Sequence, residues 1–319
     1  MADFTSFLAD MDQVAYVRSA ELTEGDGRGC RIIDVFNGSG LAFTVAPDRG
    51  MNIVECSYRG IPVAFRSPSG HVAPGKFGPE EWLRNWEGGL LTSCGLRHAG
   101  PPEEGETLHG RISNASASQV GSCGAWRDGV YELTVSGVLR EASMFGENLR
   151  LARTIRTAYG ENSITVSDEV TNCSGAPDFL LMLYHCNFGW PLVSPSVQVE
   201  AEEHEIIPRT PEAAAGLARW REMPEPEVGA PEQVFFHCFP GAVSLVNREI
   251  GIRATVEREE GLPYLVQWKS FDPSRYVIGL EPANNRLEGR SAALKKGIAR
   301  RIEPGETLHF QMKISFSDC

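Results

Sequence analysis

The run Phe310-Gln-Met312-Lys-Ile314-Ser-Phe316 alternates apolar and polar side chains from end to end. Successive side chains of an extended chain point to opposite faces of a sheet, so this run gathers its apolar side chains on one face. The same alternation occurs in residues 131–135, 149–151 and 164–166. These segments are typical of half-buried strands in antiparallel sheets.

Further β-rich segments are separated by Gly, Pro and Asn turn signals. They comprise residues 30–36, 41–45, 179–185, 233–239, 264–271 and 276–280. Because strand patterns extend over nearly the whole chain, the sequence predicts an all-β fold, built as one domain over residues 1–319. Only residues 79–84 and 210–220 favour helices, since each carries a proline in its first turn. The acidic stretch 223–232 is interpreted as a connection and not as a domain boundary.

The 319 residues carry 30 lysines and arginines against 42 aspartates and glutamates, which gives a formal net charge of −12. A protein that binds nucleic acid or an anionic membrane needs a basic face, so this charge balance argues against both partners. The longest strongly apolar run, residues 179–184, is far shorter than the roughly 20 residues that cross a bilayer. The first residues lack the basic and apolar regions of a signal peptide, so we expect a cytoplasmic protein.

The eight cysteines are widely spaced, and no Cys-x-x-Cys pair is present. The spacing does not support a zinc knuckle or a thioredoxin-type site, and in a reducing cytoplasm we expect free, buried thiols. The stretch Gly25-Asp-Gly27-Arg-Gly29 is interpreted as a hairpin turn and not as a dinucleotide-binding loop. The Gly-x-Ser-x-Gly motif of serine hydrolases does not occur. The sequence thus predicts neither a bound metal nor a cofactor.

Three ionisable residues are candidates for proton transfer. His109 lies in Thr107-Leu-His-Gly-Arg-Ile-Ser-Asn114, where a glycine permits a tight turn. His185 ends an apolar run, and Glu281 follows another and precedes a proline that favours an extended backbone. Each residue alone has an ordinary structural explanation, because a histidine at the rim of a strand is often simply hydrogen bonded. The 76 residues from His109 to His185 and the 96 from His185 to Glu281 can be bridged only by tertiary structure.

The motifs around these residues resemble those of the galactose mutarotase (aldose 1-epimerase) superfamily. Its members carry a Leu-His-Gly element, a His-x-x-Phe element and a Glu-Pro element. This chain has the three elements in that order, at residues 108–110, 185–188 and 281–282.

Four longer segments resemble more closely the functionally uncharacterised DUF4432 branch of that superfamily. They are Pro47-Asp-Arg-Gly-Met51, Gly88-Gly-Leu-Leu-Thr-Ser-Cys-Gly-Leu96, Leu108-His-Gly-Arg-Ile-Ser-Asn114 and Leu280-Glu-Pro-Ala-Asn284. The resemblance implies a galactose mutarotase-like fold, a large antiparallel β-supersandwich whose concave sheet binds a sugar.

The resemblance also implies roles for the three candidates. In mutarotases the histidine of the second element is the acid and the glutamate is the base, which implies these roles for His185 and Glu281. The histidine of the first element, here His109, binds the sugar and helps to orient its ring oxygen. The arginine-bearing segment that precedes this histidine in mutarotases is not evident here, and we hypothesise that Arg111 replaces it.

Further substrate contacts are predicted for polar residues within the motifs and for tryptophans that can stack on a sugar. They are Arg49, Trp86, Arg111, Asn114, Asn187 and Trp268. The implied activity is the interconversion of the anomers of an aldose by acid–base catalysis, with a small-molecule sugar or sugar derivative as the substrate and no cofactor.

Three alternatives stay open. The first is a protein that binds a carbohydrate without turning it over, because fold does not determine function. The second is an epimerase or isomerase of a sugar phosphate or sugar acid, held by Arg111 or by the basic residues 295–301, although such a charge run is ordinarily a solvated strand face. The third is a metalloenzyme, because two histidines and a carboxylate also form non-haem iron sites, although the usual His-x-Asp/Glu spacing is absent. The sequence does not determine the sugar, the preferred anomer or the oligomeric state.

Overall fold

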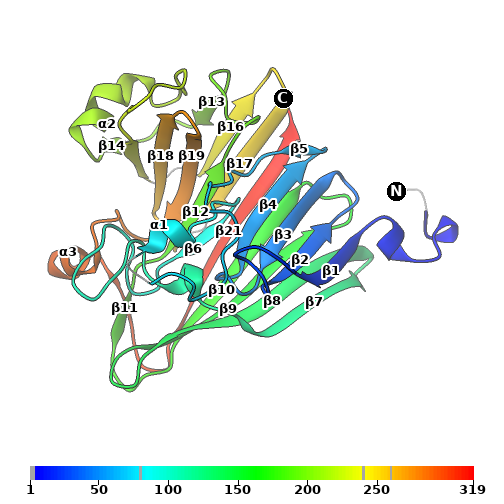
Figure 1. The fold of residues 1–319 in the computed structure, drawn as a ribbon, viewed down its shortest axis with the longest axis horizontal. Coiled ribbons are helices and arrows are strands. Elements are labelled where there is room, and N and C mark those ends of the chain that lie inside the picture. Colours follow the sequence, from blue (N-terminus) through cyan, green and yellow to red (C-terminus); the bar gives the residue numbers. More distant parts are fainter. Residues whose placement is uncertain (1–3, 79–80, 239–240, 259–260) are drawn as a thin grey trace.

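The computed structural model describes residues 4–78, 81–238, 241–258 and 261–319, and antiparallel β-strands dominate it (Figure 1). Its largest sheet has eight strands. Their spatial order is β13 (Gln198–Ala201), β16 (Ala242–Asn247), β17 (Ile252–Arg258), β21 (Thr307–Asp318), β10 (Ser163–Asn172), β9 (Asn148–Ala158), β8 (Val130–Ala142) and β7 (Ser118–Arg127). Every neighbouring pair in this sheet is antiparallel.

Three smaller sheets complete the strand structure. The five-stranded sheet has the order β1 (Tyr16–Glu21), β2 (Arg31–Phe36), β3 (Leu41–Ala46), β4 (Asn52–Tyr58) and β5 (Ile61–Pro62). The six-stranded sheet has the order β14 (Ile206–Pro208), β15 (Gln233–Cys238), β18 (Tyr264–Asp272), β19 (Arg275–Ala283), β12 (Leu183–Phe188) and β6 (Thr92–Cys94). A two-stranded ladder joins β11 (Asp178–Leu180) to β20 (Arg300–Ile302).

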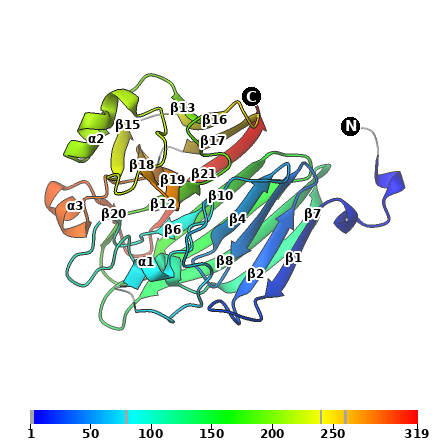
Figure 2. The ribbon, with the colours of Figure 1, turned by 45° about the horizontal axis from the view of Figure 1, so that its top comes forward.

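The five-stranded and six-stranded sheets both pack against one face of the eight-stranded sheet (Figure 2). Tyr58 of β4 stacks on Phe316 of β21 with ring centroids 5.5 Å apart. Cys186 of β12 contacts Met312 of β21, with 4.0 Å between the two sulfur atoms. Met312 and Phe316 are an even number of residues apart and therefore share a face of β21. The three sheets thus contribute to one hydrophobic core.

The alternation that predicted the strands agrees with the burial of the side chains. Met312, Ile314 and Phe316 are buried, whereas Lys313 between them is exposed. The prediction of an all-β antiparallel fold is therefore confirmed.

Two of the predicted strands differ in detail. The apolar run 179–185 does not form one strand, because it is divided between β11 and β12. The side chain of Asn284 accepts from the Met182 N–H at 2.7 Å and donates to the Leu180 carbonyl at 3.2 Å, which holds the chain where it passes from one sheet to the other. His185 consequently lies inside β12 and not at a strand end. The segment predicted at 233–239 forms β15, and its last residue lies outside the described residues.

The helices are short. The expected helix at 79–84 corresponds to α1 (Trp82–Asn85), and residues 79 and 80 lie outside the described residues. The expected helix at 210–220 corresponds to α2 (Pro211–Gly216), where the Thr210 hydroxyl accepts from the Ala213 N–H at 3.2 Å. The described residues also form the 3-10 turns η1 (Phe4–Phe7), η2 (Met11–Gln13), η4 (Ile112–Asn114) and η5 (Leu217–Arg219).

A third helix, α3 (Arg290–Lys296), was not predicted, and the expectation of a strand face at 295–301 is wrong for its first residues. Only Ala293 is buried in this helix, so no apolar stripe signals it. Gly297 ends it with a φ of 67°, and the strand begins later, at Arg300.

Two further expectations concern the whole chain. Cys123, Cys173 and Cys319 are exposed, so the expectation of buried thiols is wrong for these three, which lie on an edge strand, in a turn and at the last position of the chain. Among the helices in the described ranges, none is both long and apolar enough to cross a membrane.

Candidate active site

Strand pairing brings His185 and Glu281 together. The antiparallel register of β12 and β19 pairs Leu183 with Ala283 and Cys186 with Leu280, which places His185 opposite Glu281. The His185 Nε2 atom lies 3.4 Å from Glu281 Oε1. A side chain at Gly279, two residues earlier on the same strand, would collide with the Glu281 carboxyl group. The 96 residues between the two groups are therefore bridged by a single pair of strands.

His109 reaches the same place from a loop. Its φ of 55° lies in the left-handed region, which non-glycine residues seldom adopt. Two backbone hydrogen bonds hold it there: the His109 N–H donates to the Gly100 carbonyl and the Gly95 N–H donates to the His109 carbonyl, each at 3.0 Å. The imidazole rings of His109 and His185 are nearly perpendicular, with centroids 5.6 Å apart.

Three tryptophans surround the two histidines. The centroids of Trp86 and Trp268 lie 5.8 and 5.5 Å from that of His185, and the centroid of Trp82 lies 5.4 Å from that of His109. The indole N–H groups of Trp82 and Trp86 donate to Ser113 and Thr92, each at 3.1 Å. Because these N–H groups already have acceptors, the two rings are fixed in orientation.

These side chains line a pocket of about 300 Å³. Its described lining residues are Trp82, Leu83, Trp86, Gly100, Pro101, Pro102, Leu108, His109, His185, Arg209, Glu232, Val234, Val266, Trp268, Glu281 and Leu287. Arg209 and Glu232 are exposed, so the pocket combines aromatic walls with a polar rim. Such a pocket suits a small ligand that has both apolar faces and hydroxyl groups.

Burial disfavours charge on all three candidates. It lowers the pKa of His185 to about 4, against an opposing effect of the Asn187 amide, and lowers the pKa of His109 well below its usual range. It also raises the pKa of Glu281 well above its usual range, an effect that Arg209 opposes and Glu232 reinforces. These shifts favour a neutral carboxyl group on Glu281 and a neutral imidazole on His185.

Several polar atoms of these residues have no hydrogen-bond partner within the described part of the chain. They are Glu281 Oε1, His185 Nδ1 and His109 Nδ1. Buried polar atoms are nearly always paired, so unpaired ones in a pocket mark places where a ligand or water can bind.

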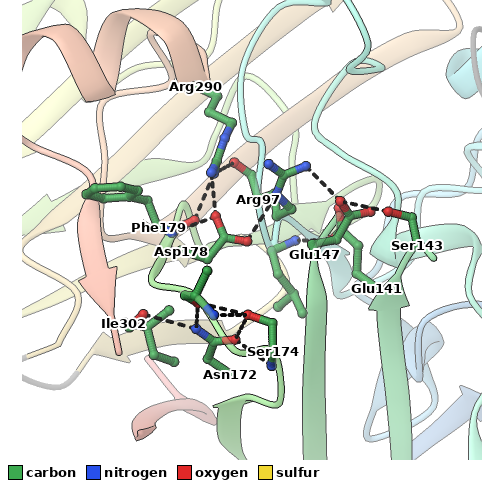
Figure 3. Close-up of polar contacts among 12 residues, drawn as sticks. Arg97, Glu141, Ser143, Glu147, Asn172, Ser174, Asp178, Phe179, Arg290 and Ile302 are labelled. Atoms are coloured by element: carbon green, nitrogen blue, oxygen red, sulfur yellow. Dashed lines mark hydrogen bonds and ion pairs between the residues drawn. The ribbon is translucent and has the colours of Figure 1, made fainter. Parts of the chain in front are cut away.

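A polar network fixes the loop that forms one edge of the pocket (Figure 3). Arg97 contacts Asp178 Oδ2 at 3.2 Å and Glu147 Oε2 at 3.0 Å. Arg290 pairs with Asp178 Oδ1 at 2.5 Å and donates to the carbonyls of Arg97 and Phe179, each at 2.9 Å. Together these contacts fasten the start of the loop to β11 and α3.

The remaining sequence candidates divide into three groups. Trp86 and Trp268 line the pocket. Arg111 and Asn114 instead line a separate cavity, and the Arg111 guanidinium donates to the Gly105 carbonyl at 2.7 Å. The chain turns at 107–110, where the Gly110 N–H donates to the Thr107 carbonyl at 3.1 Å, so neighbours in one motif face different cavities.

Arg49 and Asn187 are buried and hold the backbone. Arg49 donates to the Asn85 carbonyl, and its Nε lies 3.9 Å from Glu87 Oε1. Asn187 donates to the carbonyls of Gly89 and His185, at 3.1 and 2.9 Å. Neither is among the residues that line the pocket. Arg49 thus contacts the segment that carries Trp86, and Asn187 contacts the backbone of the strand that carries His185.

Sequence reasoning missed Trp82, Arg209 and Glu232. Trp82 had a usable signal, because it precedes Trp86 by one helical turn and so lies on the same side. Arg209 and Glu232 had none, since they belong to no motif and reach the pocket only through the pairing of β14 with β15. Within the ranges described, no group of three or more His, Cys, Asp and Glu side chains is arranged to hold a metal ion.

An antiparallel sandwich with this pocket has the galactose mutarotase-like fold. More narrowly, the chain belongs to the family described as "Domain of unknown function (DUF4432)", whose model matches residues 27–316. The resemblance seen in the sequence motifs is thereby confirmed.

Solved structures agree with this assignment. A candidate aldose 1-epimerase from Klebsiella pneumoniae is 25% identical and superposes with a TM-score of 0.90, covering 96% of this chain and 86% of that one. A galactose mutarotase-like protein from Clostridium acetobutylicum is 13% identical with a TM-score of 0.68, covering 96% and 100% of the two chains. Galactose 1-epimerase from Lactobacillus acidophilus is 13% identical with a TM-score of 0.63, covering 95% and 99%. No curated protein sequence matches the chain.

Proposed function

We propose that the protein interconverts the anomers of an aldose or aldose derivative by acid–base catalysis. The observation that carries the proposal is the buried His185–Glu281 pair in an aromatic pocket: His185 Nε2 lies 3.4 Å from Glu281 Oε1, and this oxygen accepts no hydrogen bond from the described residues. The likeness to proteins described as aldose 1-epimerases supports it.

The reaction needs only proton transfers. Glu281 removes the proton from the C1 hydroxyl as the imidazolium of His185 protonates the ring oxygen. The C1–O5 bond opens, the C1–C2 bond rotates, and the ring closes on the other face with the transfers reversed. One proton is taken up and one is released, so the pair regains its starting protonation in each cycle.

Substrate binding has to change the protonation of the pair before this step. Burial favours the neutral carboxyl group of Glu281, whereas the reaction starts from a carboxylate and an imidazolium. Hydroxyl groups of a bound sugar donate to the unpaired Glu281 oxygen and thereby favour its ionised form. We infer that substrate binding moves the proton to His185, while His109 contacts the sugar and orients its ring oxygen.

Magnetisation exchange between anomer signals in NMR tests the proposal across a panel of neutral aldoses, sugar acids and sugar phosphates. The wild-type protein should accelerate exchange for at least one of them, and Glu281→Gln and His185→Asn should each reduce the rate by about 10²- to 10⁴-fold. His237→Gln is the matched control, because His237 is buried in the same sheet but belongs to the opposite face of β15 from Val234 of the pocket.

The same experiment addresses the alternatives. A carbohydrate-binding protein without activity would shift or broaden sugar signals in proportion to its concentration, with no catalytic exchange. For an acidic or phosphorylated sugar, the cation among the described lining residues is Arg209, not Arg111 or the basic residues 295–301. Normal exchange by Glu281→Gln would contradict the proposed mechanism.

A further inference from the structure

Glu141, near the end of β8, is a buried carboxylate outside the candidate active site. It lines the separate cavity that also contains Arg111 and Arg140. Its Oε2 accepts a hydrogen bond from the backbone N–H of Leu96 at 2.9 Å. The carboxyl group therefore acts on the Gly95-Leu96 backbone and not on the pocket directly.

The Gly95-Leu96 backbone connects Glu141 to His109. On one side, the Leu96 N–H binds Glu141. On the other, the Gly95 N–H donates to the His109 carbonyl at 3.0 Å, and the Gly95 carbonyl accepts from the Ile112 N–H at 3.3 Å. The Leu96 carbonyl also accepts from the Leu181 N–H at 2.8 Å. A displacement of the Leu96 backbone is therefore transmitted through these hydrogen bonds to the turn that contains His109.

That turn depends on its neighbours. His109 occupies the left-handed region, which costs free energy for a non-glycine residue, so surrounding contacts must impose the conformation. A side chain on Gly110 would collide with the carbonyls of His98 and Gly95. The close approach shows that segments 95–98 and 109–110 are packed backbone against backbone.

The charges that face Glu141 leave it without an ion pair of its own in the described residues. Arg97 contacts Glu147 at 3.0 Å and Asp178 at 3.2 Å (Figure 3). It also contacts Glu106 at 3.5 Å. Burial raises the pKa of Glu141 to about 7, an effect opposed by the Leu96 N–H and by Arg97 and reinforced by Glu106 and Glu147. Glu141 therefore changes its charge near neutral pH.

We propose that Glu141 is a positioning residue that holds His109 in the pocket through the Gly95-Leu96 backbone, most firmly when Glu141 is ionised. A hydrogen bond to a carboxylate is about twice as strong as one to a neutral acceptor, so ionisation tightens the link to Leu96. The consequence for catalysis rests on the function proposed above, but the link between Glu141 and His109 does not.

The test follows the ¹⁵N resonances of the His109 ring, assigned by their absence in His109→Gln, as the pH is raised through neutrality in the substrate-free protein. In the wild type they should shift with an inflection near 7, the pKa of Glu141. In Glu141→Gln this inflection should disappear, because an amide keeps an acceptor for Leu96 but cannot ionise. Glu147→Gln is the matched control and should keep an inflection, since Glu147 binds Arg97 and not Leu96, but at a lower pH, because Glu147 raises the pKa of Glu141.

Turnover supplies a second readout. Above neutral pH we expect Glu141→Gln to lower kcat/KM by about tenfold, because small displacements of a positioned group reduce rates steeply. Below neutral pH the variant and the wild type should converge. If no aldose is turned over, the proposed function fails, whereas the NMR titration still decides the link to His109.

Persistence of the inflection in Glu141→Gln, or its absence in the wild type, would overturn the proposal. If Glu141→Gln does not fold, Glu141→Asp replaces it, because the shorter side chain keeps the charge but withdraws it from Leu96. The aspartate variant should lose the inflection as well, and its retention would also overturn the proposal.

Discussion

Strand β12 carries two adjacent residues that face two different buried polar clusters. The hydroxyl of Tyr184 donates to Asp168 Oδ2 at 2.8 Å in the core between the sheets. The next residue, His185, points to the other side of the strand and lies 3.4 Å from Glu281 in the pocket. The two clusters share a scaffold, but they differ in how fully their polar atoms are paired.

The core cluster is fully paired. Arg153 donates from Nε and Nη2 to the two oxygens of Asp168, at 2.8 and 2.6 Å, and from Nη1 to Ser93 and to the Gly50 carbonyl. Burial alone would lower the pKa of Arg153, but Asp168 outweighs that effect and the pKa is raised. This bidentate pair joins β9 and β10 to β6, so its role is to hold two sheets together.

The pocket pair is only partly paired, and burial shifts both of its members toward their neutral forms. The contrast teaches that buried charge stabilises the fold where every atom has a partner. Where polar atoms are left unpaired in a cavity, they are available to form hydrogen bonds with a ligand or to exchange protons with it. Four predictions test this distinction.

The largest expected effect concerns the core cluster. Arg153→Met leaves Asp168 buried without its counter-charge and should lower the free energy of unfolding by about 3–5 kcal/mol. Urea unfolding measures this loss. Adding Asp168→Leu should restore part of the stability, because the remaining charge is removed as well. A loss below about 1 kcal/mol in the single variant would erase the contrast between the clusters.

The second prediction concerns the pocket pair. Glu281→Gln should change the free energy of unfolding by less than about 1 kcal/mol, because it replaces a group whose charged form is already disfavoured by burial. Its anomerisation rate should nevertheless fall by about 10²- to 10⁴-fold. A variant that unfolds as readily as Arg153→Met would assign Glu281 a structural role instead.

The third prediction uses Glu141, whose pairing is intermediate between that of the core cluster and that of the pocket pair. It has one hydrogen-bond partner and no ion pair of its own in the described residues. Its pKa is raised to about 7 from 4.5, so the folded state holds the proton more tightly than the unfolded state. The protein should therefore lose stability, on the order of 3 kcal/mol, as the pH rises from 4.5 through 7. Glu141→Gln should remove this loss and unfold at a higher temperature than the wild type at alkaline pH only. If thermal unfolding of Glu141→Gln and of the wild type had the same pH dependence, this prediction would be wrong.

The smallest expected effect concerns Arg209, at the polar rim of the pocket. Arg209 donates to the Leu287 carbonyl at 3.4 Å and is exposed, so an ion pair with an acidic or phosphorylated sugar contributes at most about 1 kcal/mol. If such a sugar is a substrate, Arg209→Gln should raise its KM by about fivefold at low salt and leave the KM of neutral aldoses unchanged. Arg111→Gln, in the separate cavity, is the control. An equal effect on neutral aldoses would show that Arg209 binds hydroxyl groups.

Local patterns predicted much of the fold. The alternation in residues 310–316 reflects the two faces of a strand, and the Thr210 cap and following proline identified α2. The single strand expected at 179–185 was wrong, because its division depends on Asn284, more than a hundred residues away. Helix α3 escaped prediction because it buries almost nothing.

The candidate site was predicted less completely. His109, His185, Glu281, Trp86 and Trp268 meet in one pocket, although their roles stay predictions. Arg49, Arg111, Asn114 and Asn187 belong to the same motifs but lie elsewhere. Proximity in a motif therefore did not imply proximity to the pocket.

The amino-acid sequence by itself determined the strands, the turns and the residue types able to transfer protons, because side-chain alternation and backbone sterics act over a few neighbouring residues. Only the tertiary structure decided which of those residues face one another. That outcome depends on the register between β12 and β19 and on the closing of a loop around His109, both of which arise from contacts between segments far apart in the chain.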